Sequence, residues 1–134
     1  MRPCILVVEN EYPGNIPTRK LVLESAKLNV LTAFTPDEAI QALQRFPNID
    51  GIVLDTQLRG RDCAMLIEDL RALQPDMPII TISPTGQTPC GNENIHVSSY
   101  DPVHLIEAVQ KIAPLRMSYV VKREKEIISR LANP

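Results

Sequence analysis

Gly51-Ile52-Val53-Leu54-Asp55 is a short apolar run that ends in a single carboxylate. A continuous run of aliphatic residues without polar alternation indicates a strand buried on both faces, as in parallel sheets. Further runs of this kind lie along the chain at Cys4–Val8, Val30–Ala33, Pro78–Ile82 and Ile95–Val97. We therefore predict five buried strands, with Asp55 just past the end of the third, Gly51–Leu54.

Segments with a helical spacing of apolar residues separate the predicted strands. Thr35-Pro36-Asp37-Glu38 is a capping box, in which Thr35 accepts from the backbone of Glu38 while Glu38 reaches back to Thr35. Asp101-Pro102 is a second helix start. Alternating strands and helices predict an α/β fold, with an open parallel sheet covered on both faces. The apolar stripes are Ile16, Leu23 and Ala26; Ala39, Ile40, Leu43 and Phe46; Leu66, Ile67, Leu70 and Leu73; and Leu105, Ala108, Val109 and Ile112.

Two stretches depart from this alternation. Pro84–Asn94 is rich in turn-forming residues and has no apolar stripe, so we expect a loop with at most one helical turn and a fourth helix that is shortened or missing. Residues 1–114 then form one domain. Residues 115–134 carry spaced apolar residues and form either a solvated tail or a helical extension that docks or pairs in a homodimer.

Length and charge limit the classes of function. The chain has 134 residues, of which 44% are hydrophobic, and a net charge of −2. This balance fits one domain with a real core. No basic run is long enough to follow a phosphate backbone, which argues against direct binding of nucleic acid. The apolar run at the N-terminus is too short for a signal peptide or a membrane span, so we expect a cytoplasmic protein with no membrane contact.

The cysteines are odd in number and widely spaced. Cys4, Cys63 and Cys90 form no CxxC pair and lie at no zinc-ligand spacing from the histidines. We interpret them as three free thiols in a reducing compartment, with Cys63 as a small residue at a helix start. His96 is interpreted as a packed or edge histidine and His104 as a surface residue.

Polar side chains follow the predicted strands at one edge of the sheet. Glu9 and Asn10 come after the first strand, Asp55 after the third and Ser83 after the fourth. With strand order 2-1-3-4-5, these ends lie side by side at the carboxyl edge, where doubly wound sheets bind ligands. Oxygen ligands of this kind suit Mg²⁺ better than zinc or copper. Such a site supports attack by a carboxylate on a phosphoryl donor.

Several motifs resemble, in order, the landmarks of a response-regulator receiver domain. They are Ile5–Glu11, Val53–Asp62, Pro78–Ser83 and Tyr100–Pro102, and the resemblance runs from about Arg2 to Ile112. It implies a flavodoxin-like fold with Asp55 as phosphoacceptor and Ser83 as the hydroxyl that follows the phosphoryl group. It also implies Mg²⁺ held by Glu9, Asn10, Asp55 and the backbone carbonyl of Gln57.

The sequence also departs from the family pattern. Asn10 stands where the family usually has a metal-binding Asp, and Ser98 and Ser99 stand where it has Lys and Pro. The aromatic switch position aligns with Ile95, or with His96 if the register slips by one. Arg59 and Arg61 are candidate substitutes for the lysine, although solvent-facing loop arginines are the simpler interpretation.

The retained motifs and the departures from the family pattern leave two possible functions. The first is a phosphorylation-regulated switch with a signalling rather than an enzymatic role. A histidine kinase, a phosphotransfer protein or a small phosphodonor phosphorylates Asp55, and the altered surface changes the binding of a downstream output protein. The second is a pseudo-receiver that acts as an interaction module without phosphorylation. Asp55, Glu9 and Ser83 favour the first function. Asn10, Ser98 and Ile95 favour the second.

Overall fold

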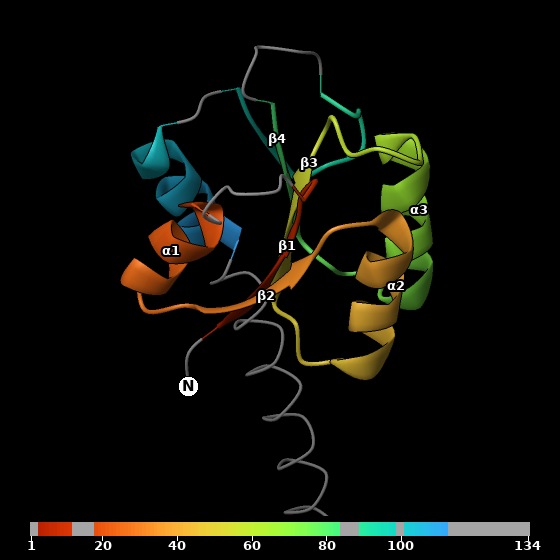
Figure 1. Cartoon of the computed structure of the whole chain (residues 1–134), viewed down its shortest axis with the longest axis horizontal. Helices are drawn as coiled ribbons and strands as arrows, with labels where there is room; N and C mark the ends of the chain where they lie inside the picture. Colours follow the sequence, from red (N-terminus) through yellow and green to blue (C-terminus); the bar gives the residue numbers. More distant parts are fainter. Residues whose placement is uncertain (1–2, 12–17, 84–88, 99–100, 113–134) are drawn as a thin grey trace, which may run out of the picture.

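A parallel sheet runs through the centre of the computed structural model, which describes residues 3–11, 18–83, 89–98 and 101–112 (Figure 1). Its five strands stand in the order β2-β1-β3-β4-β5, and both the number and the order confirm the sequence prediction. All pairs are parallel. The strands are β1 (Cys4–Val8), β2 (Asn29–Ala33), β3 (Gly51–Asp55), β4 (Ile79–Ile82) and β5 (Ile95–Val97).

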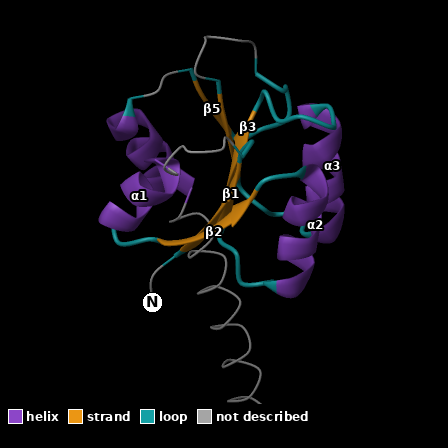
Figure 2. Ribbon diagram, viewed as in Figure 1, coloured by secondary structure: helices purple, strands orange, loops and turns teal. Residues whose placement is uncertain are grey.

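Helices cover both faces of the sheet (Figure 2). On one face lie α1 (Thr18–Ser25) and a helical segment over residues 102–112. On the other lie α2 (Pro36–Arg45) and α3 (Cys63–Leu73). This arrangement is the predicted flavodoxin-like, doubly wound fold. Among the described residues, no helix combines the length and the apolar character needed to cross a membrane.

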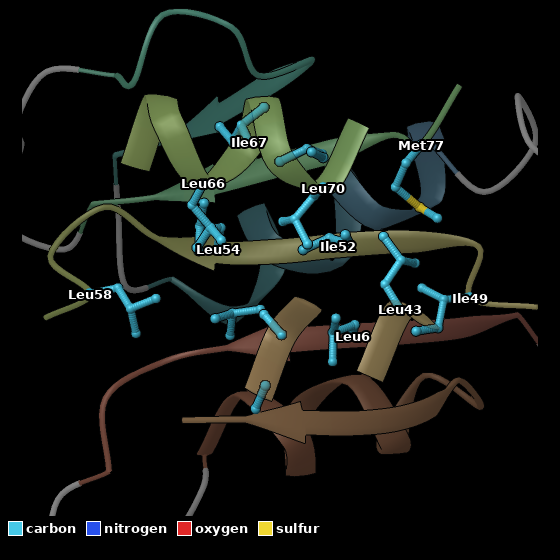
Figure 3. Close-up of a cluster of buried hydrophobic side chains, with 14 residues drawn as sticks. Leu6, Leu43, Ile49, Ile52, Leu54, Leu58, Leu66, Ile67, Leu70 and Met77 are labelled. Atoms are coloured by element: carbon cyan, nitrogen blue, oxygen red, sulfur yellow. The ribbon is translucent and has the colours of Figure 1, made fainter. Parts of the chain in front are cut away.

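The core consists of two apolar layers, one on each side of the sheet. Figure 3 shows the layer beneath α2 and α3, where Ile52 and Leu54 of β3 meet Leu66 and Leu70 of α3. Val53 points the other way and joins the layer beneath α1 and residues 102–112. Every residue of β3 is buried, as its unbroken apolar run predicts. The central strand therefore places Asp55 at a fixed point on the carboxyl edge.

The helix starts agree with the predicted caps, with one difference. The Thr35 hydroxyl accepts from the backbone N–H of Glu38 at 3.0 Å. The Glu38 carboxylate, however, accepts from the backbone N–H of Phe34 rather than returning to Thr35. The Asp101 carboxylate accepts from the backbone N–H of Val103 and starts the helical segment at residue 102.

Three apolar stripes end earlier than predicted. Phe46 lies beyond the last turn of α2 and Leu73 ends α3, so both side chains lie largely outside the core. Ala26 follows the end of α1, and Ile16 lies outside the described residues. The apolar spacing thus continues to residues whose side chains are exposed or lie beyond the helix end. The predicted extension over residues 115–134 also lies outside the described residues.

The described part of the predicted loop, residues 89–94, contains no helix and is fastened to α3. The Asn92 side chain donates to the carbonyl of Ala64 at 3.1 Å, and the Arg71 guanidinium donates to the carbonyl of Asn92 and to Oδ1 of Asn94. These hydrogen bonds hold residues 89–94 beside α3. The rest of the predicted loop, residues 84–88, lies outside the described residues.

A disulfide joins Cys63 to Cys90, so the prediction of three free thiols was wrong. Cys4 has a free thiol, and Cys63 begins α3 as predicted. The bonded cysteines are 27 residues apart in sequence. They meet because residues 89–94 fold back over the start of α3, a long-range contact that cysteine spacing alone does not reveal.

Candidate functional site at the carboxyl edge of the sheet

Asp55 lies at the centre of the carboxyl edge, as the last residue of β3. Its side chain is only 8% exposed, and both carboxylate oxygens have partners. Oδ1 accepts from the backbone N–H of Gln57 at 2.8 Å, and Oδ2 accepts from Nη1 of Arg19 at 3.1 Å. These two bonds hold the carboxylate in one orientation at the mouth of the loop that follows β3.

Glu9 joins Asp55 through a shared arginine. The same Nη1 atom of Arg19 lies 3.2 Å from Oε2 of Glu9. Glu9 and Asp55 therefore lie close together at the sheet edge, and the Arg19 guanidinium contacts both carboxylates. Burial raises the pKa of Glu9, the Arg19 charge opposes this shift, and the nearby Asp55 charge adds to it.

Sequence reasoning missed Arg19, which comes from the first turn of α1. Its side chain is 13% exposed although it carries a full charge. The first turn of α1 contains no acidic residue but two adjacent basic ones, Arg19 and Lys20. Basic residues are unfavourable at the positive end of a helix dipole, and this was the available signal that an arginine there has an anionic partner.

Asn10 connects the loops that follow β1 and β3. Its Nδ2 donates to the carbonyl of Gln57 at 3.0 Å, and its Oδ1 accepts from the backbone N–H of Arg59 at 3.0 Å. A carbonyl can only accept and an N–H can only donate, so this pair of bonds determines which way the amide points. Both polar ends of Asn10 are therefore occupied by the loop.

Ser83 follows β4, on the strand that neighbours β3. The register pairs Asp55 with Ile82, so Ser83 lies one residue beyond the level of Asp55. Ser83 is fully buried, and its backbone N–H donates to the carbonyl of Val97 at 2.8 Å. The structure thus places Glu9, Asn10, Asp55 and Ser83 at one edge of the sheet, on the ends of β1, β3 and β4.

The family model described as the response regulator receiver domain matches residues 5–104 of the chain. This chain belongs to the response-regulator receiver family. Two curated relatives of the receiver domain are the transcriptional regulatory proteins GlrR of Escherichia coli K12 and QseF of Escherichia coli O157:H7. Each is 27% identical over 88 residues, which is 66% of this chain and 20% of the relative. The chain therefore spans about a fifth of the length of these regulators.

Solved receiver structures share the fold of this receiver domain. A receiver domain protein from Clostridium thermocellum has a TM-score of 0.77 at 17% identity, covering 87% of this chain and 98% of that one. A receiver protein from Sinorhizobium medicae has a TM-score of 0.71 at 24% identity, covering 86% and 97%. NtrX from Brucella abortus has a TM-score of 0.74 at 23% identity, covering 96% of this chain and 30% of NtrX.

The positions at which the sequence resemblance shows departures lie partly in the site, as Asn10 does, and partly on or after β5. Ser98, in place of the lysine, is exposed at the end of β5. Neither predicted substitute contacts Asp55 in the described residues: the Arg59 side chain is exposed, and Arg61 pairs with Asp69 of α3. The described ion pair of Asp55 is with Arg19 instead.

The alternative switch positions Ile95 and His96 belong to β5, away from the Asp55 carboxylate. Ile95 packs against the apolar layer beneath α1. His96 contacts the Thr81 hydroxyl through Nδ1 at 2.8 Å, and that hydroxyl donates to Glu93 at 2.6 Å. His96 is thus a packed histidine, as predicted.

The predicted Mg²⁺ ligands of the receiver domain do not fit a divalent cation as they are placed. The Asn10 oxygen faces the Arg59 N–H, and the Gln57 carbonyl accepts from Asn10. Oε2 of Glu9 and Oδ2 of Asp55 both contact Nη1 of Arg19. In the described part of the chain, no group of three or more His, Cys, Asp or Glu side chains is arranged to hold a metal.

Proposed function

We propose that this receiver domain accepts a phosphoryl group on Asp55 and thereby changes its binding of a downstream output protein. The donor is a histidine kinase, a phosphotransfer protein or a small phosphodonor. The observation that carries the proposal is the position of Asp55, an almost buried carboxylate held by Arg19 and the Gln57 N–H on the central strand of a receiver fold. The role is signalling, and a cytoplasmic location belongs to the same proposal.

The chemistry assigned to Asp55 is nucleophilic attack. A carboxylate oxygen forms a bond to phosphorus, and the bond from phosphorus to the donor breaks. The electron pair of that bond leaves with the donor, on an imidazole nitrogen of a phosphohistidine or on the acetate oxygen of acetyl phosphate. The product is an acyl phosphate, and phosphotransfer adds negative charge to a pocket that already contains Glu9.

Arg19 supplies positive charge for this step. Its guanidinium already contacts Asp55 Oδ2 and carries further N–H donors that suit phosphoryl oxygens. In this account, Arg19 takes the charge-pairing role that the resemblance gives to a lysine at position 98. Ser83 contributes the hydroxyl that follows the phosphoryl group. Mg²⁺ is the cofactor that the family resemblance implies, but no step is assigned to it, because Asn10 bonds to the Gln57 carbonyl and the Glu9 and Asp55 carboxylates contact Arg19.

The change in Asp55 is transmitted through its loop. Gln57 donates to Asp55 Oδ1, and its carbonyl accepts from Asn10, so movement of the carboxylate alters both loops at the edge. The surface that changes therefore includes the exposed residues of the loop after β3. The curated relatives are transcriptional regulators, and we propose a protein rather than nucleic acid as the direct partner here, since the chain has a net charge of −2.

Intact-protein mass spectrometry after incubation with acetyl phosphate tests the proposal, with and without Mg²⁺. The wild type should gain the mass of one phosphoryl group, while an Asp55→Asn variant should gain none. Asp50→Asn is a matched control, because Asp50 accepts from the backbone N–H of Cys4 at the opposite end of the sheet. No adduct from acetyl phosphate or from a histidine kinase, in folded protein, would favour the pseudo-receiver.

A further inference from the structure

A single nitrogen atom contacts two carboxylates of this receiver domain, those of Glu9 and Asp55. Nη1 of Arg19 lies 3.2 Å from Glu9 Oε2 and 3.1 Å from Asp55 Oδ2, and the three side chains are 13%, 14% and 8% exposed, respectively. Charges with so little contact with water require a partner, and removing one member leaves an uncompensated charge. The guanidinium nitrogen therefore stands between two carboxylates, which is where a bound cation would also lie.

Asn10 completes the arrangement. Its amide needs both a donor and an acceptor to bond the Gln57 carbonyl and the Arg59 N–H at the same time. An aspartate at position 10 has no donor for the Gln57 carbonyl and adds a third carboxylate beside Glu9 and Asp55. Asn10 and Arg19 thus both make the net charge of the site less negative. Asn10 is neutral where an aspartate would be charged, and Arg19 adds a positive charge.

We infer that Arg19 is the resident cation of this site, and that Mg²⁺ binds only in competition with it. The pocket is then held in place by the chain itself, without a divalent ion. This inference goes beyond the proposed function, because it concerns the resting pocket and holds whether or not Asp55 accepts a phosphoryl group. It also joins two separate sequence features, the amide at position 10 and the basic start of α1, in one physical explanation.

Calorimetric titration with Mg²⁺, in the absence of any phosphodonor, tests the inference. We compare the wild type with Arg19→Gln, which keeps hydrogen-bonding capacity but loses the charge. Because the two cations compete for the same oxygens, Arg19→Gln should bind Mg²⁺ roughly tenfold more tightly or better, within the usual range of coupling between sites. Equal affinity in the two proteins, or no binding to folded Arg19→Gln, overturns the inference.

Lys20→Gln provides the matched control. Lys20 is the neighbour of Arg19 in α1, but its side chain is 43% exposed and pairs with Glu24 at 3.8 Å. This variant removes the same charge from the same turn, and its Mg²⁺ affinity should equal that of the wild type. A gain similar to that of Arg19→Gln would show that the general charge of the helix, and not Arg19 itself, excludes Mg²⁺.

A measurement on the wild type alone covers the case in which Arg19→Gln does not fold. Its thermal midpoint in a chelator should not change when the chelator is replaced by millimolar Mg²⁺. A ligand raises the midpoint only when its concentration is comparable to or above its dissociation constant for the folded state. A clear rise of the midpoint with Mg²⁺ overturns the inference. The mass experiment reports phosphoryl transfer separately, so failure of either claim is distinguishable from failure of the other.

Discussion

The side-chain amide of Asn10 donates to the backbone carbonyl of Gln57 at 3.0 Å, across two loops that are 47 residues apart in sequence. The resemblance to receiver domains makes both groups metal ligands, yet in this chain they bond to each other. The loop after β3, which carries the partner of Asp55 Oδ1, is therefore fixed by a hydrogen bond rather than by a shared ion.

Replacing Asn10 with Asp should destabilise the domain. The change removes the donor to the Gln57 carbonyl and places a carboxylate near Glu9 and Asp55, at a cost of roughly 1–3 kcal/mol. Urea unfolding in a chelator measures the loss, and Mg²⁺ should restore part of it by supplying the missing charge. Asn48→Asp, at an exposed position, should leave the free energy of unfolding unchanged. An Asn10→Asp variant as stable as the wild type in chelator contradicts this account of the loop.

The Cys63–Cys90 disulfide should be present in the purified protein under non-reducing conditions. Titration of thiols in denaturant is expected to find one free thiol per chain, that of Cys4, and none in Cys4→Ser. Reduction should lower the free energy of unfolding by about 3 kcal/mol, because the bond closes a loop of intermediate length. The Cys63→Ser/Cys90→Ser protein should be insensitive to reductant. Three titratable thiols in the wild type would restore the original sequence prediction.

Glu93 should make the free energy of unfolding depend on pH in the acidic range. Burial acts to raise the pKa of Glu93, but hydrogen bonds from the Thr81 hydroxyl and the backbone N–H groups of Gly91 and Cys90 outweigh it, and the pKa is lowered. A carboxyl group with a lowered folded-state pKa stabilises the fold above its ordinary pKa, and this contribution disappears as the pH falls through the lowered value.

The Glu93→Gln variant tests this dependence. The wild type should lose its stability advantage over Glu93→Gln as the pH falls below the ordinary glutamate value of 4.5. Glu107→Gln, at an exposed position on the helical segment 102–112, should run parallel to the wild type throughout. A constant difference between the wild type and Glu93→Gln at all pH values contradicts the assigned role of these hydrogen bonds.

The strands and their order followed from the sequence because the determining pattern is local. A run such as that of β3 has no polar residue until Asp55, so its burial on both faces and the position of its end are visible in five residues. The same reasoning placed Glu9, Asn10 and Ser83 at one edge. Apolar spacing gave a wrong prediction of burial at Phe46 and Leu73, whose side chains are exposed at the ends of α2 and α3.

Apart from the local bond between Glu38 and Phe34, the main interactions that were missed join parts of the chain that are distant in sequence. Arg19 reaches Asp55 from 36 residues away, through a side chain whose direction depends on where α1 begins. The prolines before α1 make its first residue uncertain in the sequence. The direction of the Arg19 side chain could therefore not be predicted. Cys63 and Cys90 meet because the Asn92 and Arg71 hydrogen bonds fold residues 89–94 onto α3. Spacing alone carries no information on such contacts.

Chemical mapping of the phosphoryl group tests whether Asp55 is the phosphoacceptor. Protein treated with a phosphodonor is reduced with borohydride, which converts an aspartyl phosphate to homoserine, and is then digested and sequenced by mass spectrometry. The account predicts homoserine at position 55 in the wild type and at no position in Asp55→Asn. Modification at another residue, or unmodified Asp55 in protein that carries a phosphoryl adduct, would contradict the assignment of Asp55 as the phosphoacceptor.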